Sequence, residues 1–140
     1  MKEVEILLVE DNSGDVLLTQ EALLNWDTKN RISSVGDGEE AIRYLKASAT
    51  ETMSQLPDLV ILDINLPKLD GKQVLQLIRS DVDLKHLPVV IFSSSVNDKD
   101  VREAKELNAD LYLQKPAELQ HYFDAVYTIE QFWTSYKKAI

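Results

Sequence analysis

Residues 59–67 read LVILDINLP, which puts an acidic residue directly after an uninterrupted apolar run. Consecutive apolar residues over 59–62 are typical of a strand that is buried on both faces of a parallel sheet. Burial of an isolated carboxylate inside such a strand would cost several kcal/mol. We therefore expect Asp63 to lie at the mouth of the strand, next to groups that compensate its charge.

Short apolar runs alternate with segments of helical period along the chain. The runs predict strands at residues 6–9, 31–35, 59–62, 89–92 and 111–113, of which 31–35 is the weakest. Helices are predicted at residues 16–24, 39–45, 74–78, 101–107 and 119–136. This alternation predicts an α/β fold, a doubly wound five-stranded parallel sheet with helices on both faces. Ligands of such sheets bind beyond the carboxyl ends of the strands, where Asp63 is expected.

Length and composition narrow the classes of protein. The 140 residues, 44% of them hydrophobic, fit a single domain over residues 1–140. The net charge of −9 repels nucleic-acid backbones and anionic membranes, so neither is an expected partner. There is no cysteine for a disulfide or a thiolate metal site, and the amino terminus, MKEVEILLVEDN, is typical of neither a signal peptide nor a membrane span. A soluble cytoplasmic protein is expected.

Polar residues follow each of the four strongest predicted strands. They are Glu10 and Asp11, then Asp63 and Asn65, then Ser93, Ser94 and Ser95, and finally Lys115 and Pro116. The sheet topology brings them to one edge, where three carboxylates would repel one another without a cation. Oxygen ligands without sulfur or histidine select Mg²⁺. Beside such an ion, the Lys115 ammonium and the Ser93 hydroxyl would form a pocket for a phosphoryl group.

Each of these features also has an ordinary structural explanation. Glu10 and Asp11 could cap a helix or face solvent, and Asp63 could be a turn acid. The serines could form a plain loop, and Lys115 could be one more solvated lysine. Coincidence at four matching strand ends is less probable than one shared site.

In this order, these residues resemble the receiver domain of two-component response regulators, a flavodoxin-like (βα)5 fold. The resemblance covers roughly residues 4–130 and rests on four motifs: VEDN, LVILDINLPKLDG, the hydroxyl after PVVIF, and the KP dipeptide. It implies that Asp63 is the phosphoacceptor, which receives its phosphoryl group from a sensor histidine kinase or a histidine phosphotransfer protein.

The resemblance also implies a role for each residue around the acceptor. Asp11 and Asp63 would bind Mg²⁺ directly, together with the backbone carbonyl of Asn65, and Glu10 would support the ion through water. Lys115 would hold the phosphoryl oxygens. Ser93, where the family more often has threonine, would be the switch hydroxyl, and Tyr112 would be the aromatic residue that turns inward on activation. An ordinary strand tyrosine is the alternative for Tyr112.

The last predicted helix, about residues 118–138, carries a heptad pattern. Its stripe consists of Leu119, Tyr122, Val126, Ile129, Trp133, Tyr136 and Ile140, flanked by Phe123, Tyr127 and Phe132. At about 1.5 Å per residue this helix is longer than a strand, so its final turns are expected to overhang the sheet. Aromatic residues exposed there would form a homodimer interface. Folding of the tail onto its own core is the alternative.

Two further expectations concern loops and partners. Residues 47–57, ASATETMSQLP, are expected to form a surface loop, whose role stays open. We expect no output module after the receiver-like segment and expect signalling to proceed by protein docking. The loop, the PKLDG motif and the EQFW-type last helix resemble the small response regulators that partner bacteriophytochrome-type kinases.

Three other functions compete with the phosphoacceptor hypothesis. A phosphate-independent pseudo-receiver scaffold would not need the acids and the lysine. An aspartyl-phosphate phosphatase would need a second acid two residues after Asp63, where Asn65 stands. Flavodoxin-like cofactor binding lacks a glycine-rich phosphate loop. A signalling protein, and not an enzyme, is the expectation.

Overall fold

Strands and helices alternate along the whole described chain. The computed structural model describes residues 3–51, 56–95 and 97–139. The strands are β1 (Val4–Val9), β2 (Asn30–Val35), β3 (Leu59–Leu62), β4 (Val89–Ser93) and β5 (Leu111–Gln114). The helices are α1 (Ser13–Leu24), α2 (Gly38–Glu51), α3 (Gly71–Ser80), α4 (Asp98–Glu106) and α5 (Leu119–Ala139). The predicted order of elements is confirmed.

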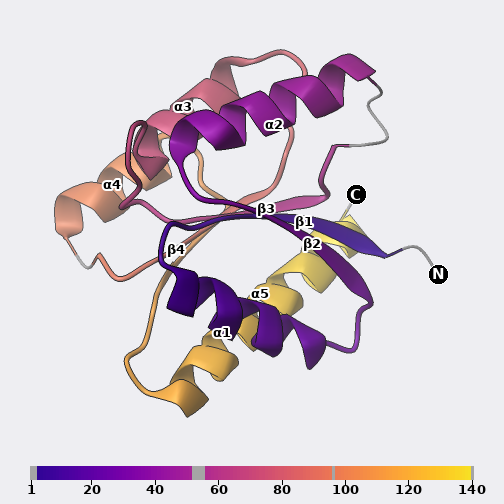
Figure 1. The fold of residues 1–140 in the computed structure, drawn as a ribbon, viewed down its shortest axis with the longest axis vertical. Helices are drawn as coiled ribbons and strands as arrows, with labels where there is room; N and C mark the ends of the chain where they lie inside the picture. Colours follow the sequence, from indigo (N-terminus) through magenta and orange to yellow (C-terminus); the bar gives the residue numbers. More distant parts are fainter. Residues whose placement is uncertain (1–2, 52–55, 96, 140) are drawn as a thin grey trace.

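The strands form one parallel sheet in the order β2-β1-β3-β4-β5. Figure 1 shows α2, α3 and α4 on one face of the sheet and α1 and α5 on the other. Every residue of β3 is buried, as expected of the central strand between two helical layers. The doubly wound parallel sheet predicted from the sequence is therefore confirmed, and its switch point lies between β1 and β3.

Two apolar clusters fill the layers. One packs α2, α3 and α4 on the sheet through residues such as Leu45, Leu75 and Ala104. The other packs α1 and α5 on the opposite face through residues such as Leu23 and Ile129. Within the described residues, no helix combines the length and the apolar composition that a membrane span requires.

The expected loop over residues 47–57 is wrong in its first part, because α2 continues to Glu51. Ala49 packs against the core, and the Ser48 hydroxyl donates to the carbonyl of Tyr44 at 2.9 Å, which a helix permits. Residues 52–55 lie outside the described residues. Leu56 packs against the core.

The final turns of α5 also differ from the expectation. Trp133, expected on an exposed overhang, is 7% exposed and belongs to the cluster under the sheet. Phe132 and Tyr136 are half-buried against the same cluster. The stripe from Tyr122 to Tyr136 therefore covers the protein's own core, which is the alternative that the heptad pattern left open. Leu119, at the start of the stripe, is exposed, and Ile140 lies outside the described residues.

Candidate functional site

The site is built where β1 and β3 end side by side. Val9 pairs with Leu62, and the N–H of Asp63 donates to the carbonyl of Val9 at 3.1 Å. The residues after these strands, Glu10 and Asp63, therefore leave the sheet as neighbours. The expected position of Asp63 at the mouth of β3 is what the structure shows.

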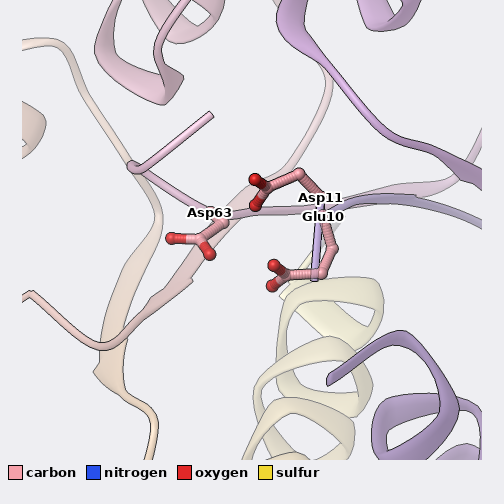
Figure 2. Close-up of side chains that lie close together, drawn as sticks. All are labelled: Glu10, Asp11 and Asp63. Carbon is pink, nitrogen blue, oxygen red and sulfur yellow. The ribbon is translucent and has the colours of Figure 1, made fainter. Parts of the chain in front are cut away.

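Three carboxylates converge at this edge. Oxygen atoms of Glu10, Asp11 and Asp63 all lie within 4.8 Å of one another. Figure 2 shows the three side chains turned toward one shared space. Glu10 and Asp63 are buried, at 4% and 6% exposed, whereas Asp11 is exposed. Hard oxygen ligands with one side open to solvent fit a divalent cation that keeps several waters.

Lys115 supplies the positive charge inside this cluster. It follows β5, and its backbone N–H donates to the carbonyl of Ser93 at 2.8 Å. Its ammonium donates to Asp63 and to Asp15, each at 2.9 Å, and to Glu10. Burial lowers the pKa of Lys115, but these hydrogen bonds outweigh burial and raise it above its ordinary value. Lys115 is therefore charged at neutral pH.

Glu10 is the acid most affected by this environment. Burial raises its pKa from 4.5 to about 7, against the opposing hydrogen bond from Lys115, and the negative charge of Asp63 adds to the rise. The Glu10 carboxylate also accepts the N–H of Asn12 at 3.1 Å. The cluster thus holds excess negative charge that a cation would relieve.

The residues expected at the switch, Ser93 and Tyr112, belong to β4 and β5, on the side of β3 away from β1. Ser93 is fully buried at the end of β4, and its hydroxyl oxygen accepts the N–H of Ser95 at 3.3 Å. Tyr112 is half-buried, and its hydroxyl donates to the carbonyl of Ser95 at 3.1 Å. Asn65 is exposed, with its N–H donating to Asp63 at 3.2 Å.

Asp15 is the site residue that the sequence did not reveal. It lies in the first turn of α1, four residues after Asp11 in the sequence, and its carboxylate accepts a hydrogen bond from the Lys115 ammonium. An acid in the first turn of a helix is ordinary because it interacts favourably with the helix dipole, so an aspartate at this position did not indicate a functional site.

Known proteins share this fold and length. Residues 6–127 match the model of the response regulator receiver domain. The response regulator Rcp1 of Synechocystis sp. is 40% identical over 128 residues, which cover 91% of this chain and 87% of Rcp1.

Two solved structures are also similar. The phosphorylated cyanobacterial phytochrome response regulator RcpA is 42% identical with a TM-score of 0.87, covering 96% of each chain. The Mn²⁺-bound form of Rcp1 is 39% identical with a TM-score of 0.85, covering 93% of this chain and 94% of that one. The chain therefore belongs to the response regulator receiver family, whose members accept a phosphoryl group in two-component signalling.

Proposed function

We propose that Asp63 accepts the phosphoryl group from a phosphohistidine of a sensor histidine kinase or a histidine phosphotransfer protein. One observation carries the proposal: a buried carboxylate, 6% exposed, stands at a strand end beside two further acids and an ammonium. In the transfer, an oxygen of Asp63 attacks phosphorus as the bond from phosphorus to the imidazole nitrogen breaks.

The neighbouring residues take distinct roles in this proposal. Mg²⁺ would be held by the Asp11 and Asp63 carboxylates and the Asn65 backbone carbonyl, with Glu10 acting through water. An ion there screens the charge between nucleophile and phosphate. Lys115, already 2.9 Å from Asp63, would hold the transferred phosphoryl oxygens.

Ser93 and Tyr112 would report the modification. New phosphoryl oxygens on Asp63 would attract the Ser93 hydroxyl, which now faces the N–H of Ser95. Movement of that loop would release the hydrogen bond between Tyr112 and Ser95, so that the tyrosine ring could turn inward. The result is a two-state switch set by local charge.

A phytochrome-type kinase is the partner that we favour. RcpA is described as a cyanobacterial phytochrome response regulator, and it covers 96% of this chain. A cytoplasmic location follows from such a partner. The homodimer through the last helix stays a prediction; exposed Leu119 and Tyr127 remain on α5 for it, while Trp133 is buried.

Intact mass spectrometry after incubation with acetyl phosphate and Mg²⁺ tests the acceptor. We expect one added phosphoryl group, absent in Asp63→Asn and in a chelated sample. Asp98→Asn, which changes an exposed acid at the start of α4, is the matched control and should gain the group. Size exclusion of the same samples tests the homodimer.

Two other outcomes would redirect the proposal. No mass gain in the folded unmutated protein, next to a working receiver, would favour the phosphate-independent scaffold. Many turnovers on small phosphomonoesters would favour an aspartyl-phosphate phosphatase over a signalling protein. Asn65 argues against that enzyme, because the position two residues after Asp63 then lacks a general acid.

A further inference from the structure

The ammonium of Lys115 is shared by carboxylates from three different segments. Glu10 follows β1, Asp63 follows β3, and Asp15 lies on α1. A lysine ammonium has three N–H donors, so these three acceptors occupy all of them. Glu10 and Asp63 belong to the proposed acceptor site. Asp15 lies on α1 and accepts the third N–H of the Lys115 ammonium.

The backbone of Asp15 is itself held from two sides. Its N–H donates to the side chain of Asn12, the N-cap of α1, at 3.0 Å. Its carbonyl accepts the Tyr122 hydroxyl at 3.3 Å, and that hydroxyl also meets the Thr19 hydroxyl at 2.7 Å in a buried contact between α1 and α5. These bonds fix the backbone of Asp15, whose carboxylate contacts the Lys115 ammonium.

Without the contact to Asp15, the Lys115 side chain could turn into a neighbouring cavity. A cavity of about 650 Å³ is lined by Asp15, Lys115, Gln114 and Tyr122, among others. The lysine stem has four flexible carbons, and ordering it costs conformational entropy. Both Lys115 and Asp15 line this cavity, and the contact between them keeps the Lys115 side chain at 6% exposed.

We propose that Asp15 is a positioning residue, which holds the Lys115 ammonium toward Asp63 for phosphoryl transfer. The proposal rests on the proposed role of Asp63 as acceptor. Asp15 does not touch the phosphoryl group and acts only through Lys115. Its loss would leave the ammonium two anchors and let it turn away from the transferred oxygens.

The test measures the rate of the mass gain with acetyl phosphate at a Mg²⁺ concentration that saturates each variant. Asp15→Asn replaces the charge-assisted contact with Lys115 by a weaker neutral one, and it is expected to slow the transfer by about threefold to about thirtyfold, the cost of a misplaced group. Glu21→Gln removes the same charge from an exposed position on α1 and should stay within about twofold of the unmutated rate. Asp15→Ser repeats the measurement with a second side chain if Asp15→Asn does not fold.

A double-mutant cycle separates positioning from a general structural effect. In a Lys115→Gln background, Asp15→Asn should change the slow residual rate by no more than about twofold, because nothing remains to be positioned. Equal slowing in both backgrounds would overturn the proposal, as would an Asp15→Asn rate equal to that of Glu21→Gln. If the unmutated protein gains no phosphoryl group, or Asp63→Asn still gains one, the acceptor proposal has failed instead.

Discussion

The Tyr112 hydroxyl donates a hydrogen bond of 3.1 Å to the backbone carbonyl of Ser95. Ser95 lies in the loop after β4, and its own N–H donates to the Ser93 hydroxyl. The aromatic residue on β5 is therefore tied to the segment that carries the proposed switch hydroxyl. Burial raises the pKa of Tyr112, so the hydroxyl remains a donor at neutral pH.

Removing this hydroxyl should destabilise the unphosphorylated protein. Tyr112→Phe keeps the ring but leaves the Ser95 carbonyl without its donor, and we expect the free energy of unfolding to fall by about 1 kcal/mol. Urea unfolding measures the change. Tyr127→Phe is the matched control, because Tyr127 is 52% exposed and its hydroxyl can bond water. Equal losses in both variants would show that the Ser95 contact contributes nothing.

Gly71 lies against the backbone of the proposed acceptor. Its N–H donates to the Ile64 carbonyl at 2.8 Å, and a Cβ at this position would lie 2.2 Å from the carbonyl oxygen of Asp63. Gly71→Ala must therefore push β3 and α3 apart, which should cost about 1–3 kcal/mol of stability and slow phosphorylation of Asp63. Urea unfolding and the mass assay measure the two effects.

Gly36→Ala is the control for this substitution. A Cβ at Gly36 meets nothing within 4 Å, so both stability and the phosphorylation rate should be nearly unchanged. A Gly71→Ala variant that is as stable and as active as Gly36→Ala would mean that the approach of Gly71 to Asp63 is not needed.

Glu10 should make cation binding depend on pH. In the folded protein its pKa is raised from 4.5 to about 7, so the stability from its bound proton is complete below about 4.5 and lost as pH rises through about 7. A cation competes with that proton. We therefore expect Mg²⁺ to raise the melting temperature more at about pH 8 than at about pH 6.

Substitution of Glu10 tests the origin of this dependence. Glu10→Gln cannot titrate, so the Mg²⁺-induced shift in melting temperature should vary less with pH. Glu21→Gln, on the exposed face of α1, should keep the pH dependence of the unmutated protein. An unmutated protein with the same shift at both pH values would mean that Glu10 does not control access of the cation.

Much of the site could be predicted because the topology of the sheet alone brings the residues that follow its strands together. The run over Leu59–Leu62 predicted β3 to the residue, since a fully buried strand is apolar throughout. Parallel strands end at one edge, so the convergence of Glu10, Asp63 and Lys115 followed from their places after strands. β1 begins at Val4, two residues earlier than predicted. The prediction missed this start because Glu5 interrupts the apolar run.

What could not be predicted depended on side chains that meet across elements. Asp15 reaches Lys115 over 100 residues of sequence separation, and its residue type is ordinary for a first helical turn. The continuation of α2 over Ala47–Glu51 was hidden because the apolar period fades after Leu45. The heptad pattern of α5 indicated an apolar face but not which surface would cover it.

Trp133 distinguishes a last helix that packs on the protein's own core from one that exposes a dimer surface. In the structure it is 7% exposed and lies in one cluster with Trp26 and Ile129, where its ring stacks on Tyr136 at 6.0 Å between centroids. Trp133→Ala should therefore cost about 3–5 kcal/mol of unfolding free energy, from lost burial and an unfilled cavity. Urea unfolding at several protein concentrations measures this cost in the monomer.

Tyr127→Ala supplies the comparison on the same helix. Tyr127 is 52% exposed in the single chain, so its truncation should change the unfolding free energy of the monomer by less than about 0.5 kcal/mol. If Trp133 instead belonged to an exposed dimer surface, Trp133→Ala would leave monomer stability unchanged and shift elution in size exclusion. A large loss of stability that does not depend on protein concentration is the result that burial in the protein's own core requires, because no second chain then contributes to the contact.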